Sequence, residues 1–320
     1  MPYIQPQPMP EVKKRLNVSE RHELARIARE NKQLGPRTVI VQPGDDIQQA
    51  IDSIANSGGG IVLLKQGTHT LVKNISGKTQ VSIIGEGRDI SILECNGNAY
   101  GLDYTGTSAV PLKNFKLIDF TIQNSNNTAG IDISFCDLWR MENVRVTSCD
   151  QIGIRFQKAQ NFNLQDVQSD NNTSHGFTVL STGVDGQTIT DIFLMNNCVA
   201  DTNSGVGFLF QPSGESTISN FTLLNCLAKD NVSHGFQLDG DATNSCLDYN
   251  FIACQSQNNG GDGFLEDPGN YRGSYVGCES DANTGDGFDI TSGSTKFINC
   301  FAVNNDVIDW DINTATPTSE

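Results

Sequence analysis

Three aspartates in the second half of the chain, Asp239, Asp241 and Asp267, are of a type and spacing that could support sugar chemistry or cation binding. Two nearby carboxyl groups can hydrolyse a glycosidic bond, because one protonates the leaving oxygen while the other attacks or activates water. Asp239 and Asp267 are the candidate catalytic pair. All three carboxylates could instead bind Ca²⁺, which prefers oxygen ligands. The remaining interpretation is a solvated acidic surface.

Two histidines, His175 and His234, each stand directly before a Gly-Phe pair. A histidine that titrates near neutral pH can remove a proton from carbon, such as C5 of a uronic acid. His234 is therefore a candidate catalytic base and His175 a candidate substrate contact. Alternatively, both are turn histidines that bond only to the backbone.

Other side chains are candidate contacts to a sugar polymer. Arg155 beside Asp132 could hold a sugar carboxylate through paired hydrogen bonds, although an exposed ion pair of little energetic consequence explains the same residues. An aromatic ring such as that of Tyr271 could stack on a sugar. The candidate binding residues are Arg155, Asp132, Gln211, Gln237, His175, Tyr271 and Arg272.

An internal repeat must position these residues. Copies begin at Cys198, Cys226, Cys254 and Cys278; in each, an Asn lies five residues on, a Gly four after the Asn, and a Phe next. The spacing between copies varies while these offsets hold, so one structural unit is repeated with length variation confined to a loop. Apolar residues alternate around each Asn, as in strands. This predicts coils of a parallel β-helix, an all-β fold.

Stacking of coils converts each repeat position into a ladder. Asn suits the turn, because it tolerates left-handed backbone angles and its amide can bond the Asn above and below. The cysteines are predicted to be buried thiols rather than disulfides or zinc ligands, since Cys behaves as a small hydrophobe and no CxxC pair is present. The ladders are Asn203, Asn231, Asn259 and Asn283; Phe208, Phe236, Phe264 and Phe288; and Cys198, Cys226, Cys254, Cys278 and Cys300.

Two outward-facing columns are predicted on the strands that follow each Gly. Coils about 4.8 Å apart match the length of a sugar residue, so these columns could accommodate a glycan. The first column is Asp103, Asp132, Arg155, Thr178, Leu209, Gln237, Leu265 and Asp289, and the second is Thr105, Ser134, Gln157, Leu180, Gln211, Asp239, Asp267 and Thr291.

From about Thr38 to Ile312 the chain resembles the right-handed parallel β-helix, or pectate-lyase-like, superfamily. The segment 45–71, DDIQQAIDSIANSGGGIVLLKQGTHTL, resembles the family's first coil, in which a helix caps the open end of the barrel; here Asp45 is the expected N-cap. The resemblance implies that a polysaccharide lies along the exposed columns. Lyases, hydrolases, epimerases and inert virion proteins all use this scaffold.

The segment from His234 to Asp239, HGFQLD, is similar to coils of bacterial mannuronan C5-epimerases, which implies an active-site role for Asp239. Those enzymes also carry a tyrosine-aspartate-proline-histidine stretch on a neighbouring coil, and this sequence has none. The paired aspartate motifs of polygalacturonases are also absent.

The charge distribution narrows the range of partners. The net charge is −16, and beyond Ala159 only Lys229, Arg272 and Lys296 are basic, so no basic face is expected for nucleic acid. No apolar run is long enough to span a membrane, and no signal peptide is recognisable. We expect an extracellular or virion-associated protein.

Three regions are expected: a proline-rich segment with a helix over 19–34 (residues 1–37), the β-helix (38–312) and a tail (313–320). The head helix either lies against the barrel or mediates assembly, as a homotrimer or on a particle.

The sequence supports two hypotheses about function. One is a carbohydrate-active protein that binds and cleaves or epimerises an acidic or acetylated polysaccharide, as a lyase, epimerase or glycoside hydrolase. The other is a non-catalytic component of a phage tail or surface assembly.

Overall fold

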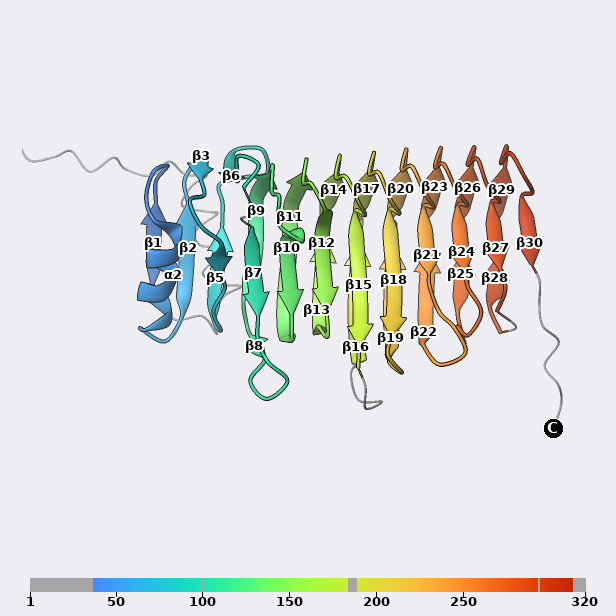
Figure 1. Cartoon of the computed structure of the whole chain (residues 1–320), viewed down its shortest axis with the longest axis horizontal. Coiled ribbons are helices and arrows are strands. Elements are labelled where there is room, and N and C mark those ends of the chain that lie inside the picture. Colours follow the sequence, from blue (N-terminus) through green and yellow to red (C-terminus); the bar gives the residue numbers. More distant parts are fainter. Residues whose placement is uncertain (1–36, 99–100, 184–188, 293, 313–320) are drawn as a thin grey trace, which may run out of the picture.

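The computed structural model describes residues 37–98, 101–183, 189–292 and 294–312. The expected head helix over 19–34 and the tail lie outside these residues. The described chain winds into an elongated parallel β-helix with one helix, α2 (Ile47–Ala55), at its first end (Figure 1). The predicted all-β fold is confirmed.

One face of the solenoid is a ten-stranded sheet, called sheet B here, which carries the predicted columns. Successive strands pair in parallel, so that Phe208 lies opposite Phe236 and Phe236 opposite Phe264. The strands are β4 (Ile75–Ser76), β7 (Leu102–Thr105), β10 (Ala129–Ser134), β12 (Ile152–Gln157), β15 (Phe177–Thr182), β18 (Phe208–Ser213), β21 (Phe236–Leu238), β24 (Phe264–Glu266), β27 (Phe288–Ile290) and β30 (Trp310–Ile312).

The other faces form a 20-stranded sheet, sheet A, in which two parallel ladders are joined through the long strands β9 and β11. Its strands are β1 (Thr38–Val41), β2 (Gly60–Leu64), β3 (Gly67–Thr70), β5 (Val81–Ile84), β6 (Ser91–Glu94), β8 (Leu112–Lys113), β9 (Lys116–Gln123), β11 (Cys136–Thr147), β13 (Gln160–Gln165), β14 (Gln168–Asp170), β16 (Ile189–Asn196), β17 (Val199–Asp201), β19 (Thr217–Leu224), β20 (Leu227–Lys229), β22 (Ser245–Ile252), β23 (Gln255–Gln257), β25 (Ser274–Val276), β26 (Glu279–Asp281), β28 (Lys296–Ile298) and β29 (Phe301–Val303).

The core consists of like residues stacked along the solenoid axis. The rings of Phe208 and Phe236 stack with centroids 4.9 Å apart, and Phe264 follows at 4.8 Å from Phe236. All nine cysteines are free, and those of the predicted ladder are buried except for half-buried Cys300. The predicted phenylalanine and thiol ladders are therefore present, and they fill the interior without disulfides.

A buried asparagine ladder sets the spacing of the coils. The Asn203 amide donates to Asn231 Oδ1 at 2.9 Å, and the Asn231 amide donates to Asn259 Oδ1 at 2.9 Å. The prediction that these asparagines adopt left-handed angles is wrong. The residue before each has positive φ, as at Thr202 (54°) and Asp230 (55°), so the ladder amide follows the corner and points into the barrel.

Helix α2 closes the first end of the barrel. It buries Ile47, Ala50, Ile51 and Ile54, as predicted. The predicted N-cap is wrong by one residue: Asp46 accepts the N–H of Gln49 at 3.0 Å, because Asp45 is used earlier, in a turn that bonds back to Gln42.

We predict that Asn231→Ala lowers the free energy of unfolding by about 3 kcal/mol, since it leaves the buried Asn203 N–H without its acceptor and removes the amide bonds to Ala200 and Asn259. Urea unfolding measures the loss. The control is the exposed Asn225→Ala, which loses only the left-handed preference at φ 52° and should cost about 1 kcal/mol. Equal losses would contradict a special role for the ladder.

A second prediction concerns Ile192, which is 53 % exposed and has φ of 52°, an unfavourable angle for a β-branched residue. Its neighbours in the same column, Asn161 and Asn220, have the same angle. Ile192→Asn should raise the free energy of unfolding by about 1 kcal/mol. Leu194→Asn, elsewhere in β16, should not stabilise. An unchanged midpoint for Ile192→Asn would show that the angle carries no strain.

Candidate functional site

The outward face of sheet B places the predicted columns in register. Asp132 lies opposite Arg155, Leu209 opposite Gln237, and Leu265 opposite Asp289. Three positions differ from the expectation of exposure, because Ser134, Thr178 and Leu209 are buried. The polar surface of sheet B is thus divided into a first part around Asp132 and a second, acidic part beyond Leu209.

The two candidate catalytic carboxylates each accept a hydrogen bond from a glutamine side chain on the preceding coil. Gln211 donates to Asp239 Oδ2 at 2.7 Å, and Gln237 donates to Asp267 Oδ2 at 3.3 Å. Both aspartates are half-buried and lie on neighbouring coils. Burial and then repulsion from Asp239 raise the pKa of Asp267. The structure thus brings together four predicted site residues.

The histidines occupy a column of positions just before the sheet B strands, where each accepts a hydrogen bond from the next coil. Val206 N–H donates to His175 Nδ1, and Asp262 N–H donates to His234 Nδ1, both at 2.9 Å. Burial lowers the pKa of His175. Because Nδ1 accepts a backbone N–H, the neutral ring carries its proton on Nε2. Asp262 Oδ2, 3.0 Å from His234 Nδ1, can form an ion pair only after that nitrogen binds a proton.

Sequence reasoning missed two acids that continue this column. Asp262 Oδ1 accepts the N–H of Asp286, and Asp286 Oδ1 accepts the N–H of Ile308. Burial and the charges of Asp262, Asp311 and Asp286 raise the pKa of the nearby Asp289 to about 6. The Asp-Gly-Phe repeats were the available signal, since their Asp stands where His stands in His-Gly-Phe.

Asp241 is engaged by its own loop. Its carboxylate accepts the N–H groups of Thr243 and Asn244 at 2.7 and 2.8 Å and the Asn244 amide at 2.8 Å. These bonds, led by the Thr243 N–H, lower the pKa of Asp241 to about 2. Within the described residues, no group of three His, Cys, Asp or Glu side chains is arranged to hold a metal ion.

The remaining candidates lie in two places. Arg155 donates to both oxygens of Asp132 on the preceding coil, so its guanidinium already has a carboxylate partner on sheet B. Tyr271 and Arg272 lie beside β22 of sheet A, where Arg272 pairs with Asp248 and Tyr271 bridges to Leu247. The structure does not bring these two residues to the acidic part of sheet B.

Comparisons with known proteins agree with this geometry. The family model described as the right handed beta helix region matches residues 79–252. The chain belongs to this family. The match confirms the right-handed parallel β-helix expected from the repeats, and no curated protein matches the chain.

Solved β-helix structures resemble this one at low sequence identity. ORF18 of Geobacillus virus E2 is 19 % identical with a TM-score of 0.62 over 91 % of this chain, which spans 64 % of the ORF18 chain. Pectate lyase Pel9A is 14 % identical, with a TM-score of 0.58 over 89 % of this chain and 83 % of the lyase. At these identities the likeness shows the fold alone.

None of the described helices has the length and apolarity to cross a membrane.

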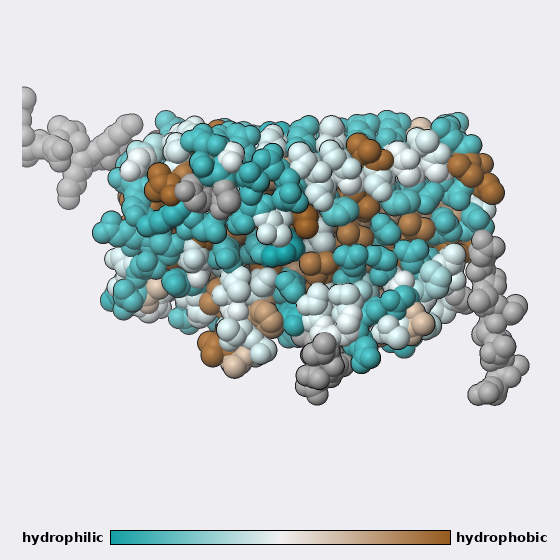
Figure 2. Space-filling model, viewed as in Figure 1, coloured by the Kyte–Doolittle hydropathy of each residue, from teal (hydrophilic) through white to brown (hydrophobic). Residues whose placement is uncertain are grey.

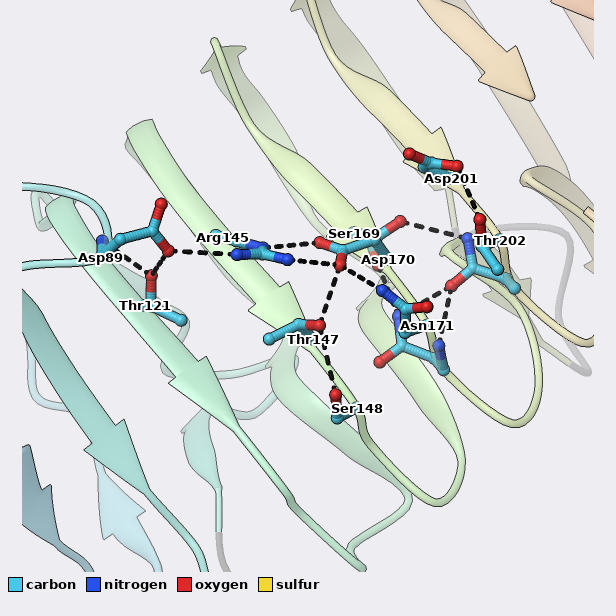
Figure 3. Close-up of polar contacts among 12 residues, drawn as sticks. Asp89, Thr121, Arg145, Thr147, Ser148, Ser169, Asp170, Asn171, Asp201 and Thr202 are labelled. Carbon is cyan, nitrogen blue, oxygen red and sulfur yellow. Dashed lines mark hydrogen bonds and ion pairs between the residues drawn. The ribbon is translucent and has the colours of Figure 1, made fainter. Parts of the chain in front are cut away.

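Sheet A of this β-helix carries a network that is structural. Arg145 donates to both oxygens of buried Asp170 at 2.8 Å and to Asp89 at 3.2 Å, while Thr147 and Asn171 also donate to Asp170 (Figure 3). The network joins coils, and its charges are paired within the protein.

Inside the barrel lies an acid that the sequence analysis did not single out. Glu266 is fully buried in a column whose neighbours are Leu238 and Ile290. It accepts hydrogen bonds from Tyr249 OH at 2.5 Å and Thr295 Oγ1 at 2.7 Å. Burial raises its pKa. Its position is internal, so it stabilises the last coils rather than contacting a ligand.

We predict a pH dependence of stability from Glu266. The folded state holds its proton more tightly than the unfolded chain, in which the pKa is about 4.3. The stability that this provides is complete below that pH and is lost as pH rises through the folded-state pKa. Glu266→Gln should therefore flatten the fall of Tm above pH 4.5, whereas the partly exposed Glu279→Gln should not. Superimposable curves for wild type and Glu266→Gln would contradict this.

Proposed function

We propose that this β-helix binds an extracellular polysaccharide along sheet B, as a secreted or virion-associated protein. The supporting observation is that carboxylates and amides alternate on neighbouring coils, in the pairs Gln211–Asp239 and Gln237–Asp267. Side chains that repeat at the coil spacing can bond to hydroxyl groups that repeat along a polymer. An acidic polymer would need Ca²⁺ between its carboxylates and these aspartates, whereas an uncharged or acetylated one would not.

We further propose acid–base hydrolysis at Asp239 and Asp267. Their backbones are one coil apart, about 4.8 Å, close to the roughly 5–5.5 Å between the carboxyl groups of retaining glycosidases. Asp267, whose pKa is raised, serves as the acid that protonates the leaving oxygen. Asp239, held by Gln211, serves as the nucleophile. In the tautomer set by the Asp262 N–H, Nε2 of His234 carries the proton, so it can donate a hydrogen bond to a sugar oxygen but cannot itself take the C5 proton of a uronic acid.

The second candidate is a non-catalytic adhesive or structural β-helix of a phage tail or surface assembly. It is favoured by the fact that Asp239, Asp267 and His234 all have partners on adjacent coils. Such bonds are sufficient to explain an inert polar surface. Here residues 1–37 attach the protein to a particle or to other copies.

A panel of polysaccharides, each with Ca²⁺ or with EDTA, tests both candidates. Binding is followed by calorimetry and cleavage by new reducing ends or unsaturated products. Binding to at least one glycan is expected, and Asp239→Asn should weaken it at least tenfold and remove any cleavage, because the variant loses the charge that Gln211 orients. Binding without products would favour the adhesive function.

The matched control is Glu279→Gln. Glu279 accepts a hydrogen bond from the Gln255 side chain at 3.3 Å, just as Asp267 accepts one from Gln237. Glu279, however, lies on sheet A. This variant should bind like wild type. Equal losses in Asp239→Asn and Glu279→Gln, or no binding to any glycan, would contradict a site on sheet B.

A further inference from the structure

The last described coil differs from all earlier coils in what it exposes. Large apolar side chains lie at its surface, and hydrophobic atoms gather at this end of the molecule, near β29 (Figure 2). We call the following residues, with their exposed fractions, the collar: Ile298 (52 %), Phe301 (67 %), Val303 (41 %), Val307 (65 %) and Ile308 (50 %).

Most of the collar arises from a change of residue type at fixed positions in the register, whereas Ile298 continues an apolar column that includes Val276. Phe301 lies opposite Glu279 and Val303 opposite Asp281, both of which are outward and polar. Ile308 likewise occupies, on the last described coil, the position that Asp286 holds on the preceding coil. Glu279, Asp281 and Asp286 remain partly exposed although a coil follows them, so an additional coil would cover the collar only in part. An apolar patch of this kind indicates a binding surface.

Strand edges reinforce this conclusion. Among the described residues, β28, β29 and β30 each pair with only one neighbour, on the side of the preceding coil. At the other end of the molecule, α2 packs on β1 and β2 and covers that edge. Unpaired edges next to apolar side chains readily bind another polypeptide segment.

Charge indicates which segment this is. The last coil carries Asp306, Asp309 and Asp311, and no Lys or Arg follows Lys296. Residues 1–36 hold seven Lys or Arg against four Glu, with Leu24 and Ile27 among their apolar residues. The acids around the collar therefore favour its pairing with this basic segment over its pairing with a second collar.

We propose that the collar of one copy binds residues 1–36 of a second copy. The described chain starts beside β1, at the end opposite the collar (Figure 1). A neighbour stacked head to tail therefore presents its residue 37 next to the collar, whereas a copy's own segment would have to run the whole length of the solenoid. Such an interface uses two different surfaces and builds rings or filaments.

Complementation between two full-length variants tests the proposal. The collar variant is Phe301→Glu with Val303→Asp, which restores the residue types of the preceding coil. The head variant is Lys13→Glu, Lys14→Glu and Arg15→Glu. Light scattering after size exclusion should show wild type growing with concentration, at moderate salt, from 34.7 kDa to dimers and beyond. Each variant alone should lose this association, and an equimolar mixture should form a dimer, because one intact head meets one intact collar.

Three results would overturn the proposal. Monomeric wild type at every concentration excludes the interface. A head variant that still dimerises alone shows collar binding collar, and a mixture that stays monomeric shows that the segment and collar do not meet between copies. Val232→Asp, at a residue 69 % exposed between β20 and β21 and away from both ends of the solenoid, is the control and should associate like wild type. Circular dichroism spectra that match wild type confirm that each variant is folded.

Discussion

Parallel pairing in strict register is the constraint on which the whole molecule depends. The buried asparagines enforce it, because each side-chain amide donates to Oδ1 of its equivalent on the next coil. That Oδ1 also accepts the backbone N–H of the same donating asparagine, as Asn231 does for Asn203. A slip of one residue would break this chain of bonds and turn inward side chains outward. The phenylalanine and cysteine ladders can then pack like on like, since their spacing is already fixed.

The same register determines how polar side chains on the surface find partners. Gln211 bonds to Asp239, Arg155 to Asp132, and the N–H of Asp262 to His234, in each case between adjacent coils. Polar groups on this surface are therefore organised along the solenoid axis. A ligand that matches them must repeat along that axis too, which favours a polymer over a compact metabolite.

Much of the fold and of the candidate site could be predicted, because in a parallel β-helix the offsets between sequence repeats determine which side chains become neighbours. Once Gly235 and Phe236 were aligned with their counterparts, Asp239 and Asp267 had to share a face of the barrel. The repeat offsets could not show which residue at each corner adopts left-handed backbone angles, which is Asp230 rather than Asn231. It also could not show that His234 bonds to the backbone of the next coil, since that depends on a rotamer. Glu266 was missed because an inward position in an apolar column is expected to be apolar.

The ends of a solenoid obey a different rule, because stacking leaves the first and last coils with one neighbour each. At the first end an amphipathic helix, α2, covers both the apolar side chains and the edge of the strands. At the last described coil, polar outward positions become Phe301 and Val303, which would reduce solubility if they faced only water. Since the register fixes which positions face outward, this change of residue type is not a consequence of packing within the barrel. It is best understood as a surface selected for contact with another polypeptide.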